Sequence, residues 1–364
     1  MKARSVDKIF LSILVILSIV GLFVFTSASL GILTDSVGQF QKTIFKQVSI
    51  FILGWIALFV AIGINYKKWD KPSKYIYIVS IIITLLVFVP GVGMSAKGAK
   101  SWIDLGFTTF QPTELLKLGF VFLYASYLAS VKDKIKTFKY GALPSLIILA
   151  VPVAVLLMQN DMGSTLSPIA AGIAMFLVAG GKKRYIASFI LIAVIMVAVT
   201  AYLSPHAMAR IKTFIDPSQN LLGSGYHLNQ SLIAVGSGQI FGRGLGQSIQ
   251  KFTFLPEATG DSIFPVASEE FGFIGSTCIV LLFLAFGLRG YKIAEAVHDI
   301  FGRMIVVGFI TLAFSQSFIN IGTMLGIVPM TGVPLIFLSL GGSALLFSLF
   351  EMGIVLNVSR LQSR

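Results

Sequence analysis

Ten long apolar runs divide this chain, and they constrain its fold more than any other feature of the sequence. A helix needs about 20 predominantly apolar residues to cross the core of a bilayer. Only 12% of the 364 residues are charged, against about a quarter in soluble domains. The sequence therefore predicts an all-α polytopic membrane protein with about ten transmembrane helices. The runs lie near 9–28, 44–65, 74–92, 112–130, 141–159, 165–181, 185–203, 263–288, 302–327 and 332–357.

The basic residues are distributed unevenly over the connections between these runs. With a cytoplasmic N-terminus, the two termini and the even-numbered connections contain 19 of the 28 Lys and Arg residues and only five of the 15 acids. Cytoplasmic segments of membrane proteins are enriched in Lys and Arg. We therefore expect both termini to be cytoplasmic. The net charge of +13 then indicates topology and attraction to anionic membrane lipid, and it is not a nucleic-acid footprint.

One extracytoplasmic segment, at about 204–262 between the seventh and eighth helices, is much longer than the other connections. Its stretch Leu228–Gly238 is apolar enough for an interfacial or re-entrant helix. Long ordered loops are usually functional. We find no internal repeat or low-complexity linker, and we expect residues 1–364 to form a single domain.

Cysteine and histidine give little scope for chemistry here. The only cysteine, Cys278, lies in an apolar run, which excludes a disulfide framework. The three histidines, His206, His227 and His298, are scattered and do not predict a metal cluster.

Ionisable residues inside membrane spans are costly and are candidates for functional sites. Glu114 and Lys117 are three residues apart and share one helix face. Two interpretations are open: a structural ion pair that locks helix packing, or the floor of a polar cavity in which Lys117 meets an anionic group.

Four carboxylates, at Glu257, Asp261, Glu269 and Glu270, lie within fourteen residues at the start of the eighth helix. Oxygen ligands of this kind suit a divalent cation, and a carboxylate could equally act as a general base. Acids also favour helix N-termini without any further function. Because adjacent residues point about 100° apart on a helix, only one of Glu269 and Glu270 needs to face the interior.

Weaker candidates are Arg210 and Lys212, which are either interfacial residues or anion ligands. Gln316 and Asn320 suit hydrogen bonds between helices. Two functional classes fit these residues, a transporter and an enzyme that acts on a lipid-linked substrate. The enzyme is favoured because Glu114, Arg210, Glu257 and Asp261 all map to the outer side.

Several motifs, in order, resemble those of the SEDS family, named for shape, elongation, division and sporulation. Its division member is a better match than its elongation member. The motifs differ from the usual family pattern at Ser101 before Trp102, at Thr259-Gly260-Asp261-Ser262 and at Pro334-Leu-Ile-Phe-Leu-Ser-Leu-Gly-Gly-Ser343. The matching stretches are Gln111-Pro-Thr-Glu114 with Lys117, Gln159-Asn-Asp161-Met-Gly163, Ser231–Gly238, Leu255-Pro256-Glu257 with Asp261, Glu269-Glu270, Asn320-Ile-Gly322 and Gly341-Gly342-Ser343.

The resemblance implies a peptidoglycan glycosyltransferase that polymerises lipid II at the outer face of the bacterial cytoplasmic membrane during cell division. It implies that Asp261 is the general base and that undecaprenyl diphosphate leaves. Lys117, Arg210, Lys212 or a divalent cation (Mg²⁺ or Mn²⁺) would meet the diphosphate, with no organic cofactor. The substrate-binding set it implies is Trp102, Glu114, Lys117, Arg210, Lys212, Glu257, Glu269 and Ser343.

Alternatives to this function are a lipid II flippase, an elongation-type polymerase and a scaffold for a transpeptidase. The sequence contains no transpeptidase domain. The resemblance therefore implies a class B penicillin-binding protein as partner, together with other membrane proteins of the division machinery at the septum.

Overall fold

The chain folds into a bundle of long helices, in agreement with the prediction. A computed structural model describes residues 5–34, 36–96, 99–104, 106, 109–216 and 223–360. Each predicted run overlaps one helix, and the chain is an all-α polytopic membrane protein. The ten helices are α1 (Lys8–Leu33), α2 (Val37–Gly63), α3 (Ser73–Leu85), α4 (Pro112–Ser130), α5 (Leu143–Met158), α6 (Met162–Val178), α7 (Lys183–Leu203), α11 (Ile263–Glu295), α12 (Ile300–Met324) and α13 (Gly342–Ser359).

Seven helices within the described residues are long and apolar enough to cross a membrane. The segment 73–88 and α6 are apolar but shorter. The remaining helix of the ten, α4, contains the charged residues Glu114 and Lys117 in its first turns. Short helical turns adjoin the bundle at η1 (Tyr66–Trp69), η2 (Leu86–Phe88) and η3 (Phe138–Ala142).

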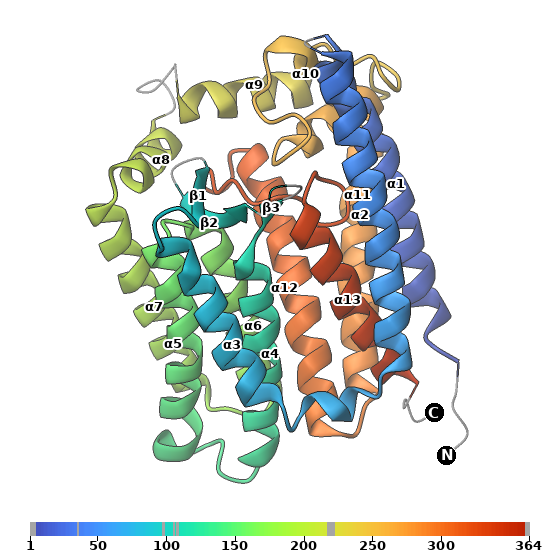
Figure 1. Cartoon of the computed structure of the whole chain (residues 1–364). Coiled ribbons are helices and arrows are strands. Elements are labelled where there is room, and N and C mark those ends of the chain that lie inside the picture. The colour runs from blue at the N-terminus through green and yellow to red at the C-terminus, as the bar shows by residue number, and fades with distance from the viewer. Residues whose placement is uncertain are drawn as a thin grey trace.

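The helix packing places α12 and α13 at the centre of the bundle and α7 at its edge (Figure 1). In the apolar windows of α12 and α13, 78% of the residues are buried, against 17% in α7. The start of α1 and the end of α13 meet, since the backbone N–H of Asp7 donates to Oγ of Ser359 at 3.0 Å. Both ends of the described chain therefore lie on one side, as the charge pattern predicts.

The opposite end of the bundle is covered by short elements (Figure 1). They are α8 (Pro205–Ile215), α9 (Ser224–Ser237), α10 (Gln250–Thr253) and an antiparallel sheet of β1 (Gly93–Ala96), β2 (Ala99–Asp104) and β3 (Thr109–Phe110) in the order β1-β2-β3. A helix over Leu228–Gly238 was expected, and α9 confirms it. The sheet was not expected, because its strands are short and β1 continues an apolar run.

Two predicted helices are shorter than expected. The third run was predicted to reach 92, but α3 ends at Leu85 and a turn leads into Val89-Pro90, where proline removes a backbone donor. The tenth was predicted from 332, but α13 begins at Gly342. The apolar segment 331–341 stays irregular because side chains bind its carbonyls: Asn320 donates to Val333 O at 2.8 Å and Gln316 donates to Pro334 O at 3.4 Å.

Candidate functional site

A polar cavity of about 290 Å³ lies at the end of the bundle opposite the termini. Its walls come from β2, the starts of α4, α6 and α13, helices α2 and α8, the turn before α11 and the irregular segment 331–341. Segments from six separate regions of the sequence therefore converge on one space. The lining residues are Lys46, Ala99, Ser101, Trp102, Thr109, Gln111, Asn160, Asp161, Ser164, Arg210, Glu257, Gly260, Asp261, Thr331, Gly332, Val333, Pro334, Leu340, Gly341 and Gly342.

Asp261 is a buried carboxylate on this cavity, with 4% of its surface exposed. It lies on a tight turn in which the N–H groups of Gly260 and Ser262 both donate to the carbonyl of Glu257, at 2.9 and 3.2 Å. Asn320 of α12 then donates to Asp261 O at 2.8 Å and to Val333 O at 2.8 Å. One buried amide thereby fixes the carboxylate turn against the segment 331–341.

Gly332 lies beside a carboxylate and a cation in the cavity. A Cβ atom at Gly332 would lie 3.6 Å from Oδ2 of Asp261 and 4.0 Å from Nη2 of Arg210. Arg210, from α8, also donates through Nη1 to Thr331 O at 3.2 Å. The open side of Gly332 therefore faces both charged groups.

Gly332 also adopts a φ of 72°, a region in which residues with a Cβ are strained. We expect Gly332→Ala to lower the activity of this site by about 10- to 100-fold, because a methyl group would displace a bound substrate from Asp261 and Arg210. The matched control is Gly326→Ala, since Gly326 has a φ of 70° and lies outside the cavity. Equal losses in both variants would show that backbone strain alone is responsible. The measurement is the enzymatic activity of the purified variants at matched protein stability.

A second polar cavity, of about 280 Å³, adjoins the first and shares Arg210, Glu257, Asp261 and Gly332 with it. His227 of α9 lines this second cavity. Its Nε2 is hydrogen-bonded to Oγ of Ser262, which in turn donates to Pro256 O at 2.7 Å. The imidazole of His227 is thus hydrogen-bonded to the side chain of the residue that follows Asp261 in the sequence.

An apolar groove of about 600 Å³ runs between α5 and α7 and ends at α8. Asn160 lines both this groove and the polar cavity. The groove is formed mainly by aliphatic side chains on two helices that face the membrane. A molecule with a polar head and an apolar chain could therefore occupy both spaces at once. The other lining residues are Ala154, Leu157, Met158, Ile195, Met196, Val199, Thr200, Ser204 and Pro205.

The cavity contains carboxylates from Asp161, Glu257 and Asp261 and cations from Lys46 and Arg210. Within the described part of the chain, no group of three His, Cys, Asp or Glu side chains converges to hold a metal ion. This donor set does not suit a cation held by protein ligands alone. One or two carboxylates are enough for Mg²⁺ where a bound ligand supplies further oxygen atoms.

Comparison with known proteins identifies the family. Residues 7–364 match the family model of the FtsW, RodA and SpoVE cell cycle proteins. The chain belongs to the FtsW/RodA/SpoVE family. This result confirms the resemblance drawn from the motifs.

Relatives of this FtsW/RodA/SpoVE protein match along nearly its whole length. "Probable peptidoglycan glycosyltransferase FtsW" of Geobacter sp. (strain M18) is 38% identical over 361 residues, which is 98% of each chain. "Stage V sporulation protein E" of Bacillus subtilis (strain 168) is 38% identical over 365 residues, which is 99% of this chain and 98% of the other.

Solved structures share the fold. A chain described under "Structural coordination of polymerization and crosslinking by a peptidoglycan synthase complex" matches with a TM-score of 0.80 at 23% identity over 99% of both chains. RodA of Thermus thermophilus matches with a TM-score of 0.71 at 23% identity over 99% of this chain and 98% of the other.

Four of the residues predicted for the site lie together in the cavity of this FtsW/RodA/SpoVE protein: Trp102, Arg210, Glu257 and Asp261. Ser343 lies just behind the wall, where its Oγ accepts the N–H of Gln111 at 3.0 Å. Lys212 is exposed on α8 and does not line the cavity.

Glu114 and Lys117 form a buried ion pair of 2.7 Å beneath the cavity wall. Lys117 also donates to Oε1 of Gln316 at 2.9 Å, and Gln316 in turn donates to Pro334, which lines the cavity. Neither charged residue lines the cavity itself. Of the two interpretations left open, this geometry fits the structural ion pair, which supports the cavity floor from below.

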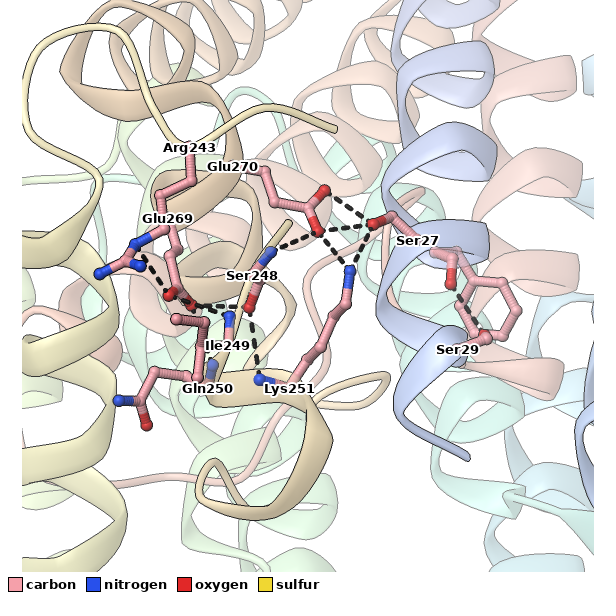
Figure 2. Close-up of polar contacts among 10 residues, drawn as sticks. Ser27, Ser29, Arg243, Ser248, Ile249, Gln250, Lys251, Glu269 and Glu270 are labelled. Atoms are coloured by element: carbon pink, nitrogen blue, oxygen red, sulfur yellow. Dashed lines mark hydrogen bonds and ion pairs between the residues drawn. The ribbon is translucent and has the colours of Figure 1, made fainter. Parts of the chain in front are cut away.

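Glu269 and Glu270 are both buried, although the helix geometry required only one of them to face the interior. The loop 241–251 folds over the start of α11, and its residues contact the carboxylates of both Glu269 and Glu270 (Figure 2). Glu269 accepts bonds from Ser248 Oγ at 2.6 Å and from two backbone N–H groups at 3.1 and 3.2 Å. Its oxygens therefore organise the loop, and Glu269 does not line the cavity.

Sequence reasoning missed Lys46, Asp161 and His227 as site residues. Lys46 carried a signal, since it is an ionisable residue inside a predicted membrane span. Asp161 lies in a matched motif, and its side chain caps α6 by accepting the N–H of Ser164 at 3.0 Å. His227 had no signal, because only the fold of α9 brings it to Ser262.

Proposed function

We propose that this protein is a peptidoglycan glycosyltransferase that polymerises lipid II at the outer face of the cytoplasmic membrane. Family membership and the names of its relatives support this proposal. The observation that carries it is the polar cavity with buried Asp261, which shares Asn160 with an apolar groove open toward the membrane. A lipid-linked sugar needs both kinds of space in contact.

The proposed reaction joins two lipid-linked saccharides. Asp261 takes the proton from the 4-hydroxyl of the acceptor sugar, which is otherwise a poor nucleophile. The hydroxyl oxygen forms a bond to the anomeric carbon of the donor as the bond from that carbon to the diphosphate breaks. The electron pair of the broken bond leaves with undecaprenyl diphosphate, through a state with oxocarbenium character.

Arg210 and Lys46 are the cavity cations that suit the leaving diphosphate, because charge that develops in the reaction is stabilised by fixed cations. Mg²⁺ or Mn²⁺ on the diphosphate would add neutralising charge, and Asp161 or Glu257 would hold it. The α5/α7 groove next to Asn160 suits the prenyl tail of the donor.

Arg210→Gln is expected to reduce the catalytic efficiency kcat/KM for lipid II by about 10- to 100-fold, because hydrogen bonds to charged groups contribute about 1.5–3 kcal/mol. Lys212→Gln is the matched control. It removes a cation two residues further along α8 that does not line the cavity. Initial rates against lipid II concentration give the comparison, and equal losses in the two variants would contradict this role for Arg210.

A flippase is the main alternative. It would move lipid II across the membrane without chemistry and would not need a general base at Asp261.

We further propose that the protein acts at the division septum with a class B penicillin-binding protein and other division proteins. The fold it shares with a chain of a peptidoglycan synthase complex supports a partner of this kind. The names of its relatives favour division, since several are called FtsW. An RodA-type role in elongation is the alternative.

The test is lipid II polymerisation by the purified protein, with and without the cognate transpeptidase and with Mg²⁺ or Mn²⁺. We expect glycan strands that are visible by gel electrophoresis. Transport of lipid II across liposomes without any polymer would favour the flippase. Depletion of the protein in cells separates division from elongation, since filaments are expected for the first and rounded cells for the second.

A further inference from the structure

The turn that holds Asp261 has little side-chain bulk of its own. Gly260 precedes the carboxylate and Ser262 follows it. A Cβ atom at Gly260 would lie 3.0 Å from Oε2 of Glu257, so only glycine fits there without moving that carboxylate. Glycine has no side chain to restrict its backbone. The position of Asp261 therefore depends on the contacts that other elements make with this turn.

Two of these contacts come from α12 and from the segment 331–341. Asn320 donates to Asp261 O at 2.8 Å, and the N–H of Leu340 donates to Thr259 O at 2.7 Å. Both contacts hold backbone carbonyl oxygens of the turn. They act on residues up to Asp261 and not on Ser262, which is the N-cap residue of α11.

Helix α9 supplies the contact at Ser262. Oγ of Ser262, which is completely buried, is hydrogen-bonded to Nε2 of His227 and donates to Pro256 O at 2.7 Å. A serine hydroxyl has a single hydrogen to donate. Because that hydrogen goes to Pro256 O, Nε2 of His227 has its own hydrogen and donates it to Oγ of Ser262. Imidazole, hydroxyl and carbonyl therefore form one directed chain of hydrogen bonds that closes the turn.

The packing of α9 fixes the position of His227. Leu228, the next residue, is buried. Ser231, one helical turn further on, donates to His227 O at 2.8 Å and contacts Sδ of Met324 at 3.5 Å. Met324 is the last residue of α12, the helix that also provides Asn320. The two side chains that hold the turn, from α9 and from α12, are therefore supported by the same helix.

We propose that His227 is a positioning residue for Asp261: through Ser262 it fixes the turn so that the carboxylate is held at the reacting hydroxyl. This inference rests on the proposed function. His227 takes no proton from the substrate in this scheme and acts only through Ser262. The stretch 259–262 is one of the places where this chain differs from the usual family pattern, so the contact is a property of this chain.

Replacement of His227 tests the proposal through initial rates of lipid II polymerisation. His227→Leu should lower kcat by about 10- to 100-fold and leave KM for lipid II unchanged, because a small misplacement of a reacting group costs up to about 10²-fold. His227→Gln should keep most of the activity, since its amide nitrogen can donate to Ser262 as the imidazole does. Asn229→Leu is the matched control, because Asn229 is an exposed residue of α9 that does not line the second cavity.

Double variants show whether His227 acts through Ser262 and Asp261. Ser262→Ala should cost as much as His227→Leu, and the two changes together should cost no more than either alone. A tenfold coupling of this kind corresponds to 1.4 kcal/mol. In the Asp261→Asn background, His227→Leu should cause no further loss, because residues that act as a unit are not additive. A merely structural role would lower the residual rate again.

Four results would overturn the inference: a raised KM with unchanged kcat in His227→Leu, His227→Gln as impaired as His227→Leu, multiplied losses in the double variant with Ser262→Ala, or a further fall in the Asp261→Asn background. Thermal unfolding in detergent shows which variants fold. If His227→Leu does not, Ser262→Ala and His227→Gln still give the comparison.

The wild-type rate separates this inference from the proposed function. Wild-type polymer together with full activity of His227→Leu would remove His227 from its role and leave the polymerase in place. A wild-type protein that makes no polymer with partner and divalent cation present would contradict the proposed function, and the role of His227 would fall with it.

Discussion

Asp261→Asn is expected to reduce lipid II polymerisation by about 10²- to 10⁴-fold, the range that a positioned general base contributes. The amide has nearly the shape of the carboxylate, so Asn320 can still bind the backbone of the turn at Asp261 O. The variant therefore removes the proton acceptor while it keeps the structure of the turn. The measurement is the initial rate of glycan synthesis with the transpeptidase and divalent cation present.

The control for this prediction is the thermal stability and partner binding of Asp261→Asn, both of which should match the wild type. Full activity in the variant would remove Asp261 from the role of base. The search would then move to Glu257, which lines the same cavity, before Glu114 and Glu269, which do not.

Glu270→Ala is expected to lower the free energy of unfolding by about 3–5 kcal/mol, because it leaves the buried Lys251 ammonium without its carboxylate. Both side chains of this pair are completely buried, and the Ser27 hydroxyl also donates to the Glu270 carboxylate, with its oxygen 2.6 and 2.7 Å from the two carboxylate oxygens. The change should also weaken the tie between α1 and the loop 241–251. Unfolding of the protein in detergent, induced by denaturant or by heating, measures the effect.

A double variant, Lys251→Met with Glu270→Leu, tests the explanation. Replacement of a buried ion pair by apolar residues of similar volume is often neutral or stabilising, so the double variant should recover most of the loss. Arg243→Gln is the control at the edge of the same network. Its side chain is 39% exposed, although its partner Glu269 is buried. Solvent around the guanidinium weakens the pair, so the loss should be smaller than that of Glu270→Ala. A double variant as unstable as Glu270→Ala would contradict the assignment.

Hydropathy located the ten helices but not all of their ends. The run predicted from 332 is as apolar as a helix, yet residues 331–341 are irregular. Hydropathy measures only transfer to an apolar environment, whereas the backbone here is held by Asn320 and Gln316, which follow from packing of α12. The same limit applies to β1, whose residues continue an apolar run.

The acids at the start of α11 show a similar limit. Their spacing placed four carboxylates near one another, but it could not tell which of them meet solvent. The fold divides them into Glu257 and Asp261 on the cavity and Glu269 and Glu270 under the loop 241–251. Whether a carboxylate catalyses or organises a loop depends on what covers it, which is not a local property.

The sequence by itself determined the membrane class, the ten helices of the bundle, the common side of the two ends and the motif that contains Asp261. These properties follow from local quantities: the length of apolar runs, the position of Lys and Arg, and the spacing of motif residues. Only the tertiary structure decided that Lys46, Asp161 and Arg210 share the cavity and that His227 reaches Ser262. These residues come together because helices far apart in the sequence pack against α12 and α13, and no local pattern encodes that packing.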